Sequence, residues 1–178
     1  MSPPLFVVDT NILFHWAQAY GGVPAWADAR RLQAIAASRA FCEEPRNTIF
    51  IPGVVWCELL GVFLHKDIDL HGYVLWHRNR RAALQRLEDA IFDQSEQAHF
   101  RLGEGEFDLD LVMSITRAAV PLHLLEQLRP PLPKLLDGMD AAILAEAWRL
   151  AEQQQDGRAV VLVSDDWGLR EMARSLQS

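Results

Sequence analysis

Short apolar runs recur along the chain, separated by longer stretches in which apolar positions repeat at helical spacing. Residues 5–8, 48–51 and 159–163 contain no charged side chain, which is typical of parallel strands covered on both faces. A further strand is predicted at 98–102. Helices are predicted at 11–19, 24–42, 52–64, 73–97, 109–128, 137–154 and 167–176. This alternation of strands and helices predicts an α/β fold with a parallel sheet.

The chain shows no internal repeat, low-complexity tract or linker, so residues 1–178 are predicted to form a single domain with an enlarged helical middle at 65–130. Half of the residues are hydrophobic and 23% are charged, which is ordinary for a soluble globular protein. No apolar run approaches the roughly 20 residues that span a bilayer. The first residues lack the basic flank and cleavage site of a signal peptide. We therefore expect a cytoplasmic protein with no membrane partner.

The formal net charge is −7, from 17 basic and 24 acidic residues. This charge argues against a protein that coats nucleic acid through bulk attraction. It leaves open an enzyme that holds a phosphodiester through metal ions and a local basic patch.

Acidic residues follow two of the predicted strands directly. Asp9 comes after the strand at 5–8, and Asp165 and Asp166 come after Ser164 at the end of the strand at 159–163. Ligands of open α/β sheets bind beyond the carboxyl ends of the strands. These residues are therefore expected at the same edge of the sheet.

Two further carboxylates extend the apolar stripes of predicted helices. Glu58 lies four residues after Val54 and four before Val62, which predicts a buried position, although a long Glu side chain can also extend from a helix edge to water. Asp140 lies three residues before Ile143, in the first turn of its helix. It either faces the core or simply complements the helix dipole.

Each of these residues also has an ordinary structural interpretation. Asp9, Asp166 and Asp137 stand where each could cap the helix that follows, and Asp is among the best capping residues. Several carboxylates gathered at one edge without matching Lys or Arg are costly to bury, however. Together they predict a site for a hard cation that prefers oxygen ligands.

In this order, the segments VVDTNIL, the Glu in the helix after the second strand, MDAAILAEA and VLVSDD resemble the PIN-domain family of metal-dependent nucleases. The resemblance spans nearly the whole chain and implies a three-layer α/β/α fold with a parallel sheet of about five strands. The acidic quartet that it implies is Asp9, Glu58, Asp140 and Asp166.

The resemblance also implies a role for each position. Asp9, Asp140 and Asp166 would lie nearest to Mg²⁺ or Mn²⁺, and Glu58 would act through water or orient the nucleophile. The supporting polar residues would be Asn11 and Ser164, with Asp137 and Asp165 as extra carboxylates.

The implied activity is that of a ribonuclease that hydrolyses RNA phosphodiester bonds by attack of water. The implied role is the toxin of a bacterial type II toxin–antitoxin pair, with a small antitoxin as partner and a possible homodimer. An alternative is a non-catalytic PIN-like module that binds RNA or protein. A phosphotransfer domain with Asp9 as nucleophile would need a second Asp where this chain has Asn11.

The densest basic stretch is a candidate for RNA binding. It contains Arg78, Arg80 and Arg81, and Lys134 is a comparable candidate just before the helix of Asp140. These side chains could contact the RNA backbone, or they could form a solvated helix face.

Overall fold

The structure is a computed structural model, and it describes residues 3–21, 27–64, 80–92, 99–103, 108–118, 138–154 and 157–176. Its strands are β1 (Leu5–Val8), β2 (Thr48–Ile51), β3 (Phe100–Leu102) and β4 (Val160–Val163). Its helices are α1 (Thr10–Gly21), α2 (Ala29–Cys42), α3 (Gly53–Leu64), α4 (Arg80–Phe92), α5 (Leu109–Ala118), α7 (Gly138–Gln153) and α8 (Trp167–Leu176).

The strands form one parallel sheet in the order β3-β2-β1-β4. The described residues thus contain four strands, where about five were expected. In the register of the sheet, Val8 pairs with Val163 and Ile51 pairs with Leu102. The residues that follow these strands therefore leave the sheet at the same end.

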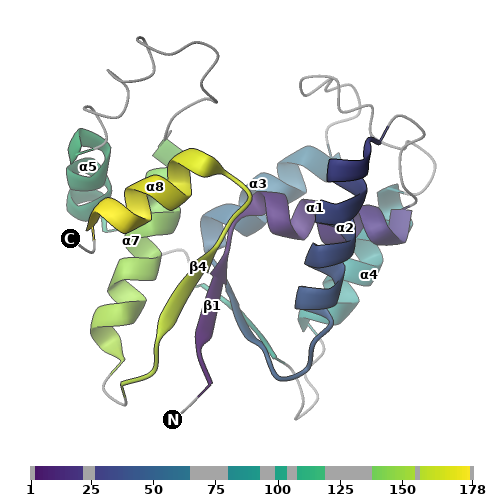
Figure 1. Cartoon of the computed structure of the whole chain (residues 1–178), viewed down its shortest axis with the longest axis horizontal. Coiled ribbons are helices and arrows are strands. Elements are labelled where there is room, and N and C mark those ends of the chain that lie inside the picture. The colour runs from purple at the N-terminus through teal and green to yellow at the C-terminus, as the bar shows by residue number, and fades with distance from the viewer. Residues whose placement is uncertain are drawn as a thin grey trace.

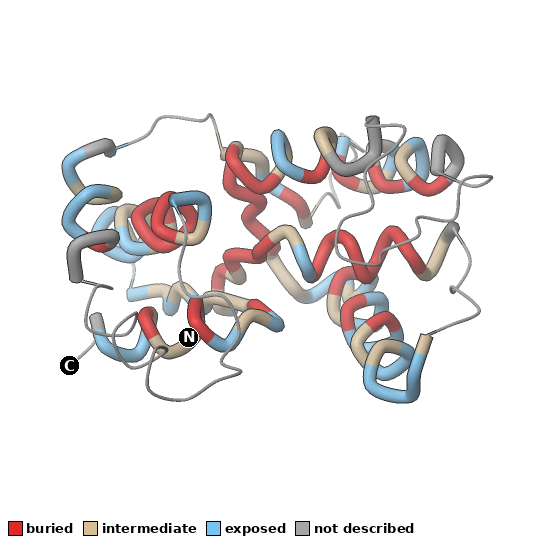
Figure 2. The backbone as a smooth tube through the Cα atoms, turned by 90° about the horizontal axis from the view of Figure 1, so that it is seen from above, coloured by how far each residue is buried: buried red, intermediate tan, exposed pale blue. Residues whose placement is uncertain are grey.

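Helices cover the sheet on both sides, as the α/β/α prediction requires. Helices α5, α7 and α8 lie on one side, and α1, α2 and α4 lie on the other (Figure 1). Helix α3 contacts both α1 and α7. The buried residues gather along the middle of the molecule, whereas the outer sides of the helices are exposed (Figure 2). Trp16, the largest fully buried side chain among the described residues, stacks on Phe100 of β3 with ring centroids 5.4 Å apart.

The sequence placed most element boundaries within a few residues of those found. The main difference is at α2, which starts at Ala29 rather than near residue 24 because Asp28 caps it by accepting a hydrogen bond from the Arg31 main-chain N–H at 2.8 Å. The predicted helices at 73–97 and 109–128 correspond to α4 and α5. The remaining parts of both predictions lie outside the described residues.

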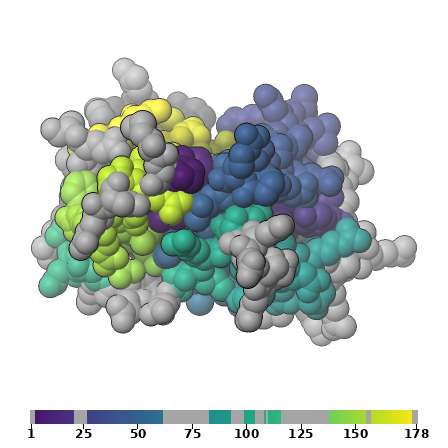
Figure 3. Space-filling model, turned by 90° about the horizontal axis from the view of Figure 1, so that it is seen from below, coloured from purple at the N-terminus to yellow at the C-terminus, as the bar shows by residue number. Residues whose placement is uncertain are grey.

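The two ends of the sheet differ in what surrounds them. At the amino end, seen from below, the start of β1 lies between the segment leading to β4 and the segment leading to β2 (Figure 3). At the carboxyl end, β1 and β4 run directly into α1 and α8, and α7 begins at this same end (Figure 1). No helix within the described residues is long and apolar enough to cross a membrane.

Candidate active site

Asp9 is the buried centre of the carboxyl end of the sheet. It follows β1, only 3% of its surface is exposed, and its main-chain N–H donates to the Val163 carbonyl at 3.2 Å. Its Oδ1 accepts the main-chain N–H of Ile12 at 3.0 Å, so Asp9 caps α1. The capping interpretation is thus confirmed for Asp9. Capping engages one lone pair of Oδ1, and a carboxylate has about four acceptor sites.

Ser164 joins the ends of β1 and β4 through its side chain. Its hydroxyl donates to Oδ2 of Asp9 in a short hydrogen bond, and its Oγ accepts the main-chain N–H of Asp166 at 2.8 Å. This arrangement follows from the register, because Val8 and Val163 are paired and the next residues emerge side by side. Ser164 therefore fixes Asp9 beside the loop that carries Asp166.

Asp166 is half-buried and caps α8, since its Oδ1 accepts the Leu169 main-chain N–H at 2.9 Å. Its neighbour Asp165 is exposed. Arg170, one turn into α8, donates from Nη1 to the Ser164 carbonyl at 2.9 Å and steadies the same loop.

The electrostatics of Asp9 show that these carboxylates act on one another. Burial raises the pKa of Asp9 from 3.8 to about 6, against hydrogen bonds from Ser164, Ile12 and Asn11 that lower it. The negative charge of Asp166 raises the pKa of Asp9 further. Asp9 and Asp166 are therefore close enough to repel each other when both are ionised.

Glu58 reaches the same end of the sheet from α3. Its Oε2 accepts a hydrogen bond of 2.5 Å from the hydroxyl of Thr10, the residue next to Asp9. The expectation that Glu58 is buried is wrong, because its side chain is exposed. It shares a helix side with the buried Val54 and Leu59, but its carboxylate extends past the strand ends towards Thr10 instead of packing on the sheet.

Asp140 stands in the first turn of α7, at the end of that helix nearest the carboxyl ends of the strands (Figure 1). It is half-buried, and the buried residues Ala141 and Ala142 follow it. Asn11 is exposed at the start of α1. Of the other candidates, Asp137, Arg78 and Lys134 lie outside the described residues, as do the side chains of Arg80 and Arg81.

Thr10 and Arg170 are two contacts of this site that the sequence did not single out. Thr10 positions Glu58, and Arg170 holds the Ser164 loop. The adjacency of Thr10 to Asp9 was visible in the sequence, but its pairing with a residue 48 positions away was not.

The carboxylate pair of Asp9 and Asp166 fits part of the coordination shell of a hard divalent cation. Within the described residues, no group of three or more His, Cys, Asp or Glu side chains is close enough to enclose a metal ion. Mg²⁺ does not need such a cage, since it keeps several waters and binds through one or two carboxylates plus substrate phosphates. The acidic pair and its repulsion are consistent with that mode of binding.

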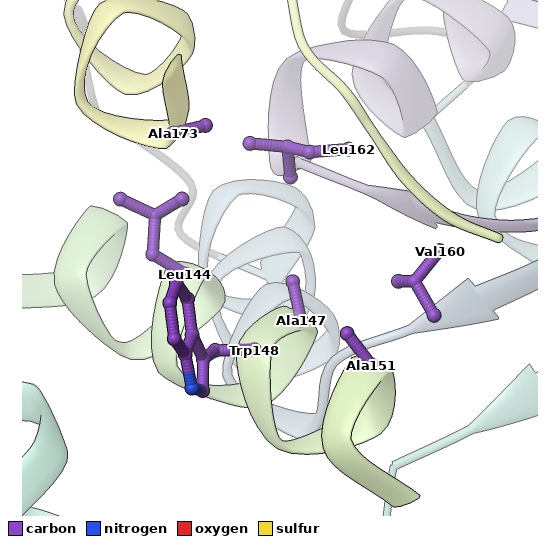
Figure 4. A pocket seen from close by; sticks show the side chains of 7 residues that line it. All are labelled: Leu144, Ala147, Trp148, Ala151, Val160, Leu162 and Ala173. Carbon is purple, nitrogen blue, oxygen red and sulfur yellow. The ribbon is translucent and has the colours of Figure 1, made fainter. Parts of the chain in front are cut away.

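A pocket elsewhere in the described structure has a different character. It lies between α7, β4 and α8, has a volume of about 90 Å³ and is lined by apolar side chains that include Leu144, Trp148, Leu162 and Ala173 (Figure 4). No charged residue lines it. This pocket therefore offers no charged side chain to bind a phosphodiester or a metal ion.

A parallel α/β sheet with carboxylates beyond its strand ends is a framework suited to phosphodiester chemistry. The family model described as PIN domain matches residues 6–177, and the chain therefore belongs to the PIN-domain family. PIN domains are generally nucleases that use divalent metal ions. A search among curated proteins found no significant match.

Proposed function

We propose that this chain is a Mg²⁺- or Mn²⁺-dependent ribonuclease that hydrolyses RNA phosphodiester bonds, with residues 1–178 as a single nuclease domain. The observation that carries the proposal is the pair Asp9 and Asp166: Ser164 binds the Asp9 carboxylate and the Asp166 main-chain N–H, and the charge of Asp166 acts on Asp9. A buried carboxylate next to a second negative charge is unfavourable in the absence of a cation. A bound divalent ion would remove that penalty.

In this proposal Asp9 and Asp166 would bind the metal ion directly, and Asp140 would reach it through a water ligand. The bound ion would polarise the phosphate and lower the pKa of a bound water. Ser164 and the α1 cap keep the Asp9 carboxylate in one orientation. Asn11 adds a weaker hydrogen bond to Asp9. The extra carboxylates, Asp137 and Asp165, would add negative charge around the site.

Glu58 has a separate role in this proposal. Its carboxylate is exposed and held by Thr10, so it is accessible to water while its direction is fixed. A carboxylate in that position can orient the attacking water or act through a water ligand of the metal. Arg78, Arg80, Arg81 and Lys134 remain candidates for contacts with the RNA backbone.

The biological role we propose is that of the toxin of a bacterial type II toxin–antitoxin pair, acting in the cytoplasm. A small antitoxin would then cover the acidic end of the sheet, and the nuclease could form a homodimer. Induced expression should halt growth, and coexpression of an antitoxin encoded beside the gene should restore it. Growth arrest that no neighbouring gene relieves would contradict this role while leaving the nuclease proposal intact.

A non-catalytic PIN-like module that binds RNA or protein is the second candidate. It is favoured by one observation: no three carboxylates approach one another closely within the described residues. Its weakness is Asp9, because an uncharged Asn or Ser could cap α1, and a pure binding module would not need a buried carboxylate whose pKa is raised to about 6.

Cleavage of labelled RNA in the presence of Mn²⁺ separates the two candidates. Wild type should cleave, and Asp9→Asn should lose activity while keeping the α1 cap, since an Asn oxygen can accept the Ile12 N–H. Asp108→Asn is the matched control, because Asp108 caps α5 in the same way, through the Leu111 N–H at 2.9 Å, and is exposed. Equal cleavage by wild type and Asp9→Asn would rule out the proposed site. RNA binding without cleavage would favour the non-catalytic module.

A further inference from the structure

The first residue of α8 is a tryptophan that stands exposed beside the carboxylates. Trp167 directly follows Asp166, and 40% of its surface is accessible. The core side of the same helix is formed by Leu169 and Met172, which are almost completely buried. Trp167 is therefore on the outer side of an amphipathic helix, where a large apolar ring contributes little to folding.

Two arginines share that outer side with the indole. Arg170 and Arg174 follow Trp167 by three and seven residues, a spacing that places the three side chains along one face of a helix. Arg170 is held at the Ser164 carbonyl and Arg174 pairs with Glu171 on the surface. We call Trp167, Arg170 and Arg174 the α8 stripe.

An aromatic ring interleaved with basic side chains is the pattern by which proteins hold single-stranded nucleic acid. The ring stacks on a base and the guanidinium groups contact the backbone. Each guanidinium carries five N–H donors, so the bond from Arg170 to Ser164 leaves donors for a phosphate. The surface pair of Arg174 with Glu171 is weak enough for a phosphate to compete.

We propose that the α8 stripe is a binding subsite for single-stranded RNA, in which Trp167 stacks on one unpaired base next to the scissile phosphate. The inference rests on the proposed ribonuclease function and names how its substrate is held. Asp9 and Asp166 repel phosphates before a metal ion binds, and the net charge of the chain is −7. Stacking does not depend on charge, and the stripe places positive charge one helical turn from the carboxylates.

The same exposed ring could instead be covered by a protein partner. The arginines favour RNA, because an apolar docking surface would not need two guanidinium groups beside its anchor. A protein partner is therefore treated as an outcome of the test.

Binding of a labelled RNA 12-mer tests the subsite without relying on cleavage. It should be measured in chelator, where the RNA stays intact, for wild type, Trp167→Ala, Trp167→Phe and Trp148→Ala. Trp148 is the matched control, because it is 37% exposed and lies eight residues beyond Asp140, about 12 Å along α7. Trp167→Ala should bind about 5- to 150-fold more weakly, Trp167→Phe should recover most of the loss, and Trp148→Ala should match wild type.

A set of 12-mers, each lacking one base, identifies the stacked position. One of these RNAs lacks the base that stacks on Trp167. Wild type should bind this RNA with the same reduced affinity that Trp167→Ala has for the intact RNA. For Trp167→Ala, removal of that base should change nothing further. Arg174→Gln should reduce the slope of log affinity against log salt by about 0.7, as expected for one lost phosphate contact on a single strand.

Equal RNA affinity of Trp167→Ala and wild type would overturn the subsite. A protein partner whose binding depends on Trp167 would not change that conclusion. Equal affinity, together with Mn²⁺-dependent cleavage, would leave the ribonuclease proposal standing. If Trp167→Ala binds RNA more weakly as expected but wild type does not cleave RNA, the RNA-binding subsite would be supported and the ribonuclease proposal rejected. Absence of both RNA binding and cleavage would reject both.

Discussion

Replacement of Asp9 by Asn should stabilise the metal-free protein at neutral pH. Burial holds the pKa of Asp9 at about 6 in the folded state, whereas the unfolded chain has the ordinary value of 3.8. At pH 7 both states are largely ionised, and the folded state bears the larger penalty for that charge. A shift of about two pKa units corresponds to about 3 kcal/mol, a large part of the 5–15 kcal/mol that stabilises a typical domain.

The sign of the pH dependence follows from the direction of the shift. The folded state keeps its proton up to a higher pH than the unfolded chain does, so wild type loses stability as the pH rises from about 4 to about 6. Asp9→Asn cannot ionise and should not show this loss. Its advantage should therefore be close to zero at pH 3.5 and reach about 3 kcal/mol at pH 7, or roughly 6–12 °C in melting temperature.

Urea unfolding in chelator, at several pH values between 3.5 and 8, measures this advantage directly. The hydrogen bonds should survive the substitution, because an Asn oxygen can accept the Ile12 N–H and the Ser164 hydroxyl can turn to accept from the Asn amide. Asp108→Asn, the exposed cap of α5, should change stability by less than about 0.5 kcal/mol. A stability gain that is the same at pH 4 and pH 7, or a loss at every pH, would refute the reasoning.

Four other predictions concern the site and its surroundings. Glu146→Gln should stabilise the protein at pH 7 and lose this advantage as the pH falls towards 4.5, because burial raises the pKa of Glu146 above that value; unfolding at pH 7 and at pH 4 tests it. Gly103→Ala should lower the free energy of unfolding by about 1–3 kcal/mol, since its Cβ would collide with Oε1 of Glu146 and lie 3.1 Å from the Gly53 nitrogen. Ser164→Ala should destabilise by a similar amount, measured the same way, because Asp9 and the Asp166 N–H both lose a partner. Millimolar Mn²⁺ should raise the melting temperature of wild type but not of Asp9→Asn.

Three of these four predictions have a result that would contradict them. A neutral Gly103→Ala would mean that the carboxylate of Glu146 moves away at little cost. A pH-independent effect of Glu146→Gln would mean that its carboxylate reaches water. An unchanged melting temperature of wild type in Mn²⁺ would count against the metal proposal itself.

The sequence was sufficient for the sheet because its strands are short apolar runs with polar residues directly after them. Asp9 and Ser164 could be placed at one edge from the chain alone, since each follows a buried strand. The pairing of β1 with β4, and hence the hydrogen bond between these two residues, depends on strand order, which no local pattern encodes.

Burial cannot be predicted from hydrophobic periodicity alone. Periodicity predicts which residues share a helix face, but not which other elements pack against that face. Glu58 is on the side of the buried Val54, yet it extends past the sheet and is exposed. Trp148 is at helical spacing from the buried Leu144, yet it lines the apolar pocket with 37% of its surface accessible. In both cases the neighbouring elements, and not the helix itself, decide the burial.

The central claim is that Asp9 and Asp166 share one divalent cation, and a crystal of the protein grown in Mn²⁺ tests it most directly. The anomalous scattering of manganese should give a peak between the two carboxylates at the carboxyl ends of β1 and β4, and Asp9→Asn should lose it. Manganese bound elsewhere, or equal occupancy in wild type and Asp9→Asn, would contradict the claim.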